Sequence, residues 1–271
     1  PGTSRGITGK ASLKVISVAS HDTASAVVAA PLSSTSAYIS SGTWSLAGLE
    51  LQEPLVNGQV AEANFTNEGG AYGTTRFLKN VMGMWLLERC RSEWRDRGTE
   101  TGYDDLIEAA FNAESGSLIF PDDQRFVNPP SMLDAIAQQL QETGQDFDPD
   151  PAEVAKLIFD SLAFRYATVL RTASRLAGRE VGRIEILGGG GRNRYLNQMT
   201  ANATGLPVRA GLFEATVVGN AMVQAIAAAQ FDGLSDARNH VEQVTRFHEF
   251  SPSKIDTELI ARYEEIEKRY L

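Results

Sequence analysis

A strand-like run, Arg183–Leu187, leads directly into four glycines, Gly188–Gly191, and then into a helical pattern over Asn193–Ala203. A second pair follows, because Pro207–Ala210 is short and apolar and Glu214–Gln230 is rich in Ala and Val. Strands that alternate with helices are typical of an α/β protein, in which each helix crosses back over the sheet. The second half of the chain therefore predicts an α/β fold.

The first forty residues predict strands of another kind. Leu13–Ala19, Ser25–Ala30 and Ala37–Ser41 are short runs of apolar and β-branched residues, and turn-forming residues separate them. Three such strands with short connections predict an antiparallel meander. Together with the alternating segments, they predict a mixed sheet with this meander at one edge and helices around it.

The other periodic segments predict helices, because their apolar residues recur at helical spacing. They are Thr75–Arg95, Asp104–Ala113, Met132–Glu142, Pro151–Ala177 and Ile255–Tyr270. The longest has a suitable N-cap in Asp150 and a helix-ending glycine in Gly178. Trp85–Leu87, within the first of these helices, is expected to lie in the core.

Composition excludes several classes of protein. The formal net charge of -9 argues against a general nucleic-acid binder, which needs a basic face. The single cysteine, Cys90, allows no internal disulfide and is expected to be a packed core residue, and the three histidines lie too far apart for a zinc site. No apolar run reaches membrane-spanning length and no secretion leader is visible, so we expect a cytoplasmic protein.

Asp22 is the first candidate for chemistry, since it follows a predicted strand and stands between His21 and Thr23. A carboxylate held rigidly at a strand end suits a general base, and its neighbours suit a polyol substrate. The alternative is an ordinary turn aspartate that bonds its own backbone.

Two glycine-containing turns are candidates for holding phosphate. Gly42 permits close approach of the backbone, and Thr43 adds a hydroxyl and an N–H group. The four-glycine turn, including Gly189 and Gly190, precedes a helix N-terminus, which is a natural place for an anion. A hairpin turn and a tight strand–helix crossing are the alternatives, and neither the dinucleotide fingerprint nor a Walker A loop is present.

These motifs, in this order and spacing, resemble the C-terminal half of the FGGY carbohydrate kinases. The likeness extends over nearly the whole chain and is carried by SHDTASAVVAAP (20–31), SSGTWSLAG (40–48), TNEGG (66–70), RFLKNVMGMWLLERC (76–90), FPDDQRFVNPPSM (120–132), GGGGRNRYLNQMTANATGLPV (188–208) and EATVVGNAMVQAIA (214–227). The resemblance implies a ribonuclease-H-like domain of the actin and hexokinase ATPase type. It also implies that 11–271 is the nucleotide-binding domain and that 1–10 is a linker from a first domain that this chain lacks.

The resemblance also implies roles for individual residues. Asp22 matches the catalytic base, with His21 and Thr23 beside it in the sugar pocket. The residues that match nucleotide-contacting positions are Gly42, Thr43, Asn80, Glu88, Gly189 and Gly190. The implied cofactors are ATP and Mg²⁺, and no metal ligand is expected in this half, because the Asp-x-Gly-Thr/Ser turn that helps hold magnesium belongs to the first domain.

The implied reaction is ATP-dependent phosphorylation of a ketose at its primary hydroxyl, in a complete enzyme of which this half alone is inactive. Within the family the likeness favours L-rhamnulose, with fuculose, xylulose and ribulose as alternatives. A non-catalytic nucleotide-binding module is a further alternative. One residue departs from the family pattern, since Glu88 stands where a glutamine is expected, and a carboxylate there would repel phosphate or bond a ribose hydroxyl.

Overall fold

The computed structural model describes residues 2–4 and 13–271. Its strands are β1 (Gly2–Ser4), β2 (Leu13–Val15), β3 (Ser36–Ser41), β4 (Trp44–Leu51), β5 (Thr66–Gly69), β6 (Thr75–Met82), β7 (Arg183–Leu187), β8 (Val208–Leu212) and β9 (His248–Phe250). Its helices are α1 (Asp22–Ala29), α2 (Gly58–Glu62), α3 (Trp85–Asp96), α4 (Tyr103–Ala110), α5 (Met132–Glu142), α6 (Pro151–Ala177), α7 (Arg194–Thr204), α8 (Ala215–Ala227), α9 (Leu234–Val244) and α10 (Thr257–Tyr270), with 3₁₀ turns η1 (Gln124–Phe126) and η2 (Gly189–Arg192).

A seven-stranded mixed sheet forms the centre of the molecule, in the order β5-β6-β4-β3-β7-β8-β9. The central strand β3 pairs in parallel with β7 and antiparallel with β4. The strands β3, β7 and β8 run parallel, so their carboxyl ends reach one edge of the sheet. The mixed sheet with flanking helices, expected from the sequence, is confirmed.

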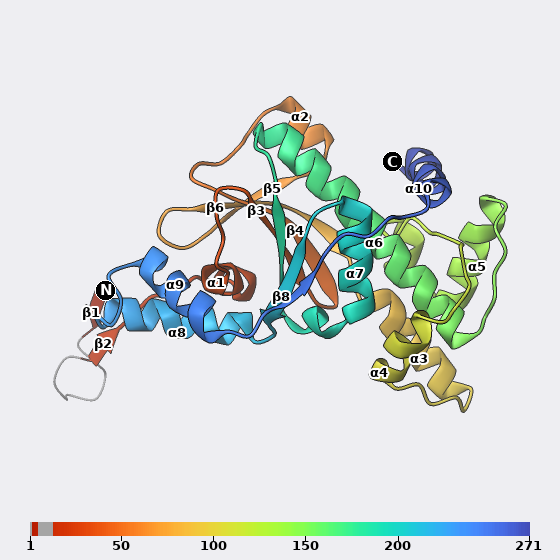
Figure 1. Ribbon diagram of the computed structural model, residues 1–271, viewed down its shortest axis with the longest axis horizontal. Helices are drawn as coiled ribbons and strands as arrows, with labels where there is room; N and C mark the ends of the chain where they lie inside the picture. Colours follow the sequence, from red (N-terminus) through yellow and green to blue (C-terminus); the bar gives the residue numbers. More distant parts are fainter. Residues whose placement is uncertain (1, 5–12) are drawn as a thin grey trace.

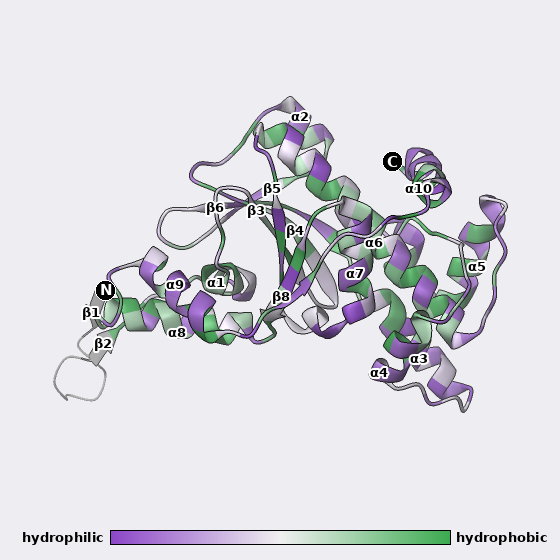
Figure 2. Cartoon of the chain, in the orientation of Figure 1, coloured by the Kyte–Doolittle hydropathy of each residue, from purple (hydrophilic) through white to green (hydrophobic). Residues whose placement is uncertain are grey.

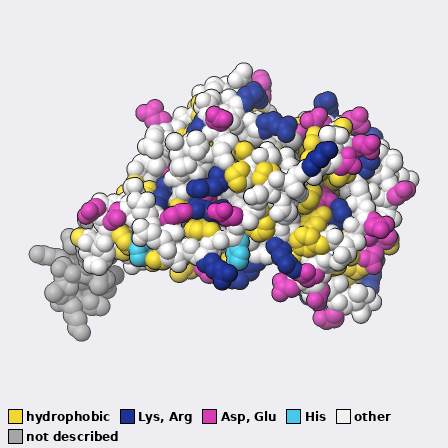
Figure 3. Space-filling view, viewed as in Figure 1, with side chains coloured by type: hydrophobic (Ala, Val, Ile, Leu, Met, Phe, Trp, Pro, Cys, Tyr) yellow, Lys and Arg dark blue, Asp and Glu magenta, His cyan; other side chains and the backbone are white. Residues whose placement is uncertain are grey.

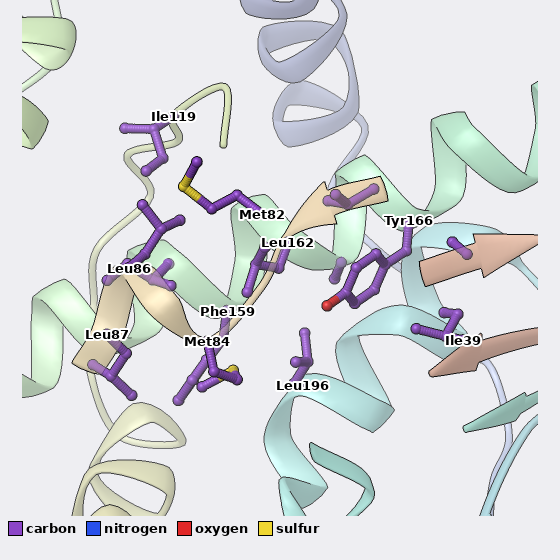
Figure 4. Close-up of a cluster of buried hydrophobic side chains, with 14 of the residues drawn as sticks. Ile39, Met82, Met84, Leu86, Leu87, Ile119, Phe159, Leu162, Tyr166 and Leu196 are labelled. Atoms are coloured by element: carbon purple, nitrogen blue, oxygen red, sulfur yellow. The ribbon is translucent and has the colours of Figure 1, made fainter. Parts of the chain in front are cut away.

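Helices cover both faces of this sheet. Figure 1 shows α1, α8 and α9 on one side and α6 and α7 on the other, with α3, α4, α5 and α10 beyond α6. Successive residues of β3 alternate between the two layers: Tyr38 packs with α1, α8 and α9, whereas Ile39 packs in the larger core on the α6 side. Figure 4 shows this larger core, in which Ile39 and Tyr166 lie among side chains from α3, α6 and α7.

The long helices match the prediction closely. Met132–Glu142 and Pro151–Ala177 are helical over the predicted ranges, and Arg183–Leu187 is a strand. The Asp150 side chain caps α6 at its start, and Gly178 ends it with a φ of 57°. Figure 2 shows hydrophobic and hydrophilic residues interspersed along α6.

Two predicted N-terminal strands are wrong. Leu13–Ala19 forms only the three-residue β2, which pairs with β1 outside the central sheet, and Val15 is 47% exposed. Ser25–Ala30 belongs to helix α1, so Asp22 begins a helix and does not follow a buried strand. The antiparallel meander exists, but it is built by β3, β4, β6 and β5.

The helix predicted over Thr75–Arg95 is also partly wrong. Its first part is strand β6, which pairs with β4 along its full length, and only α3 is helical. The break falls at Gly83, where a Cβ would lie 2.7 Å from the carbonyl oxygen of Gly42, so only glycine lets the chain pass between the strand and the helix. Leu86, Leu87 and Cys90 are fully buried as expected, whereas Trp85, also expected in the core, is only partly buried against it.

Two expectations concern the chain outside the sheet. Of the predicted linker Pro1–Lys10, Gly2–Ser4 forms β1, and the other residues lie outside the described part of the structure. None of the described helices combines the length and the apolar character that crossing a membrane would require.

Candidate nucleotide and catalytic site

The candidate site lies at the edge of the sheet where β3, β7 and β8 end. Gly42 and Thr43 follow β3, the glycine turn follows β7, and helix α8 begins just after β8. Because these strands are parallel neighbours, segments far apart in the sequence meet at this edge. In folds with parallel strands this is where ligands bind.

The turn at Gly42 and Thr43 is fixed by the start of α3. The carbonyl oxygens of Gly42 and Thr43 accept hydrogen bonds from the backbone N–H groups of Met84 and Trp85, each at 3.0 Å. The Gly42 N–H donates to the carbonyl of Trp44 at 3.1 Å. Both carbonyls are therefore used internally, and the Thr43 side chain remains available to a ligand.

The glycine turn presses against the end of β3. Gly188 has a φ of 84°, a conformation that favours glycine, and a Cβ on Gly190 would lie 2.0 Å from Oγ of Ser41. A Cβ on Gly189, by contrast, would meet no atom within 4 Å. Close packing thus explains two of the glycines, whereas Gly189 leaves bare backbone facing open space.

The two turns border one cavity of about 450 Å³. Five of the six residues expected to contact a nucleotide line it, namely Gly42, Thr43, Glu88, Gly189 and Gly190. The sequence interpretation did not single out the other lining residues, which are Met84, Tyr103, Asp104, Ile107, Arg192 and Asn193. Of these, Asp104 and Asn193 carried a signal, because each begins a helix that the sequence predicts.

The cavity has an apolar wall and a polar wall. Met84 and Ile107 supply apolar surface, as a flat base would require, while the glycine backbone supplies N–H groups. The Asn193 side chain is 1% exposed; its Oδ1 accepts the N–H of Leu196 at 2.9 Å, and its Nδ2 has no partner among the described residues. That Nδ2 is a buried donor whose hydrogen-bonding capacity is unused in this chain.

Glu88 is less repulsive to a phosphate than its charge suggests. Its carboxylate accepts a hydrogen bond from Nη1 of Arg91 at 2.8 Å, so much of the negative charge is compensated locally. The Arg91 guanidinium also lies 5.1 Å from the ring centre of Tyr103. Burial, reinforced by the charge of Glu88, raises the pKa of Tyr103, so its hydroxyl stays protonated as a hydrogen-bond donor.

Asn80 lies elsewhere than predicted. It is on strand β6, opposite Leu46 of β4, and not on a helix. It is exposed and lines a neighbouring cavity together with Trp44, Lys79 and Asp122. Within this chain, therefore, the structure does not bring Asn80 to the two glycine-containing turns.

Asp22 is the first residue of α1 and reaches the same sheet edge. Its backbone carbonyl accepts a hydrogen bond from Oγ1 of Thr216, at the start of α8, at 3.2 Å. Its carboxylate lies 2.9 Å from Nδ1 of His21 and accepts the N–H of Thr23 at 2.6 Å. The side chain of Asp22 is 74% exposed and does not line this cavity.

A comparison with family profiles decides the relationship. The FGGY family of carbohydrate kinases, C-terminal domain, matches residues 37–228, which is most of the chain. The chain belongs to the FGGY family of carbohydrate kinases. A rhamnulokinase from Bacteroides thetaiotaomicron is 45% identical over 248 residues, which are 91% of this chain and 50% of that protein. The chain thus spans about half the length of this curated relative.

Solved structures of FGGY kinases share the fold. A xylulose kinase from Rhodospirillum rubrum superimposes with a TM-score of 0.63 at 13% identity, covering 91% of this chain and 48% of that one. Plasmodium falciparum glycerol kinase with ADP superimposes with a TM-score of 0.66 at 11% identity, covering 92% of this chain and 50% of that one. The expected ribonuclease-H-like fold of the actin and hexokinase type is confirmed.

The FGGY fold implies a magnesium ion with the nucleotide. Within residues 2–4 and 13–271, no group of three or more His, Cys, Asp or Glu side chains gathers closely enough to hold a metal ion.

Proposed function

We propose that the chain is the nucleotide-binding half of an ATP-dependent ketose kinase, with L-rhamnulose as the sugar and L-rhamnulose 1-phosphate as the product. The observation that carries the proposal is the cavity between the two glycine-containing turns, at the sheet edge that also holds Asp22. The 45% identity to a rhamnulokinase supports the choice of sugar. We further propose that the complete enzyme is cytoplasmic, where ATP is available and Cys90 stays reduced.

In this proposal Asp22 is the general base. It takes the proton from the primary hydroxyl of the sugar as that oxygen attacks the γ-phosphorus, and the bond to the β-phosphate oxygen breaks to release ADP. Asp22 is the first residue of α1, and its side chain is 74% exposed, so a sugar hydroxyl could reach the carboxylate. His21 and Thr23 hold the carboxylate on one side and leave its exposed face for the sugar.

The nucleotide would lie in the cavity, with its base against Met84 and Ile107 and its phosphates toward Gly42 and Thr43. Gly189 and Gly190 would bring backbone against the nucleoside, and Asn80 would approach it from the neighbouring cavity when a second domain closes. Such closure would exclude water, whose attack would waste ATP. We propose that this second domain precedes a domain spanning 11–271 and supplies most of the sugar contacts. This half alone would therefore not phosphorylate the sugar.

The first test uses Asp22→Asn in the full-length enzyme. We expect kcat to fall about 10²- to 10⁴-fold, the usual contribution of a general base, while the Kd for ADP measured by calorimetry stays within about twofold. The matched control is Asp105→Asn, which changes an exposed aspartate in the first turn of α4 and should retain normal turnover. Normal turnover of Asp22→Asn would remove Asp22 from this role.

The second test separates the sugars from each other and from a non-catalytic module. A coupled ADP-release assay on the full-length enzyme compares L-rhamnulose, fuculose, xylulose and ribulose. We expect the highest kcat/KM with L-rhamnulose. Binding of ADP without turnover of any of these ketoses would instead support a nucleotide-binding module.

A further inference from the structure

Helix α1, which begins with Asp22, depends on its neighbours for its placement. It has only eight residues, and an isolated helix of that length is unstable in water. All residues from Thr23 to Ala29 are buried, and Figure 1 shows the helix enclosed between the sheet and the pair α8 and α9. Whatever fixes α1 therefore also fixes the acid at its start.

At the C-terminal end of α1, Arg238 of helix α9 supplies two hydrogen bonds, in addition to the one that the N–H of Ala30 donates to the carbonyl of Val27 at 3.2 Å. Its Nη2 donates to the carbonyl of Val27 at 2.9 Å, and its Nε donates to the carbonyl of Val28 at 3.1 Å. Carbonyl groups in the last turn of a helix lack partners and carry a partial negative charge. The last turn of α1 contains no basic residue of its own, so Arg238 takes that place from another helix.

Arg238 is itself held by the sheet. Its guanidinium forms a two-pronged ion pair with Glu50 of β4, at 2.8 and 3.0 Å. Both side chains are largely buried, at 11% and 13% exposed, and Glu50 also accepts a hydrogen bond from Thr74. Paired donors to one carboxylate fix the orientation of an arginine as well as its position. The end of α1 is thereby tied to the sheet at a defined point.

The other end of α1 rests on α8. Thr216 bonds the carbonyl of Asp22, and farther along the helix a Cβ on Gly219 would lie 1.7 Å from the carbonyl oxygen of Ser25. The backbones of the two helices are therefore in direct contact, and α1 cannot shift along α8 without losing it. With a rise of about 1.5 Å per residue, the Val27 and Val28 carbonyls that Arg238 holds lie roughly 8–9 Å along the helix from Asp22.

We propose that Arg238 is a positioning residue, which fixes the C-terminal end of α1 and thereby the direction of the Asp22 carboxylate. The inference rests on the proposed role of Asp22 as the base. A rigid short helix that tilts at one end moves its other end, and a misplacement of about 1 Å can cost up to 10²-fold in rate. The glycine-containing turns follow β3 and β7 and receive no hydrogen bond from Arg238, so nucleotide binding is separable from this effect.

The test compares Arg238→Met with Arg209→Met in the full-length enzyme. Arg209 is a buried arginine, 4% exposed against 11% for Arg238, that links the sheet to α9 through Glu185 and Glu242, and among the described residues it forms no hydrogen bond with α1. We expect Arg238→Met to lower kcat about tenfold with unchanged KM for ATP and Kd for ADP. Arg238→Lys keeps a positive charge opposite the Glu50 carboxylate, so its kcat should fall less than that of Arg238→Met. Arg209→Met should lose thermal stability but retain kcat.

A double-mutant cycle with Asp22→Asn distinguishes positioning from general damage. If Arg238 acts through Asp22, then adding Arg238→Met to Asp22→Asn lowers the residual kcat no further, whereas independent effects multiply. Multiplied losses, or a normal kcat in Arg238→Met, would overturn the inference. Full turnover in Asp22→Asn would instead refute the proposed function itself.

A milder variant keeps the inference testable if Arg238→Met does not fold. Thr216→Val removes the bond to Asp22 from an exposed side chain of nearly the same shape. We expect kcat to fall about two- to fivefold with unchanged Kd for ADP. Arg238→Lys should likewise lower kcat and leave the Kd for ADP unchanged. If both variants fold and keep normal kcat, α1 needs neither anchor and the inference is wrong.

Discussion

Gly189 and Gly190 are neighbours in sequence, yet their surroundings differ. A side chain on Gly190 would overlap both Oγ and the carbonyl oxygen of Ser41, at 2.0 and 2.9 Å, whereas one on Gly189 would meet nothing. At position 190 glycine keeps the turn against β3. At position 189 it leaves the backbone open to a ligand. The lack of a side chain is thus required for packing at Gly190, whereas at Gly189 it leaves space in the cavity.

This difference predicts opposite outcomes for two alanine variants. Gly190→Ala should destabilise the fold by about 1–3 kcal/mol, because the turn must move away from Ser41. Gly189→Ala should unfold at nearly the parent temperature but bind ADP more weakly, because its methyl group enters the cavity. Thermal unfolding and calorimetry on both variants check this. Equal loss of stability in the two would contradict the assigned roles.

Residue identity in the candidate site was easier to predict than residue placement. Gly42, Thr43, Glu88 and both glycines line one cavity, as motif order implied, although their contacts with a nucleotide stay a prediction. Asn80 could not be placed, because its surroundings depend on the register between β4 and β6, which local spacing does not encode.

At the scale of elements, the pairing of α1 with α8 is the closest contact between helices at the site. The Cβ of an alanine at Gly219 would lie 1.7 Å from the carbonyl oxygen of Ser25 and 2.7 Å from its carbonyl carbon. Both atoms belong to the backbone, so no side-chain rotation relieves the overlap. The two helices would have to separate, and α1 would lose its packing.

We therefore expect Gly219→Ala to destabilise the protein by about 2 kcal/mol or more, despite the better helix propensity of alanine. Gly58→Ala is the matched control, because Gly58 is also helical and a Cβ there meets no atom within 4 Å. That variant should be neutral or slightly stabilised. Urea unfolding of both measures the difference, and equal stabilities would mean that the crossing adapts.

In the elements that sequence patterns predicted wrongly, the spacing of apolar residues did not distinguish a helix from a strand. The apolar run of α1 gives no alternation between faces, so periodicity could not separate helix from strand. In Thr75–Arg95 a strand continues into a helix with little between them, and apolar residues of both fit one helical stripe. The long helix α6 was predicted correctly, because its stripe repeats many times and both of its ends carry capping residues.

At the scale of the whole molecule, charged side chains form local ion pairs, and some of these pairs hold helix α10 at the C-terminal end of the chain. Figure 3 shows Lys and Arg side chains interspersed with Asp and Glu on the face it draws, despite the net charge of -9. Helix α10 packs on a small separate core that includes Phe164 and Tyr263, and ion pairs supplement this packing. Arg165 bonds Glu267 of α10 at 2.5 Å.

The pair of Arg125 and Glu142 links α5 to the last turn of α10, because Tyr270 donates its hydroxyl to the same carboxylate at 2.8 Å. The hydrogen bond from Arg125, and then that from Tyr270, lowers the pKa of Glu142 from 4.5 to about 2. A lowered pKa means that the folded state favours the charged form. This contribution to stability is complete above pH 4.5 and disappears as the pH falls toward 2. We expect Glu142→Gln to be less stable than the parent at pH 6 and to approach it near pH 2, as measured by unfolding in urea across this range.

Glu53→Gln, at an exposed position that no arginine contacts within the described residues, should follow the parent at every pH. A constant gap between Glu142→Gln and the parent would show that the ion pair does not titrate with the fold.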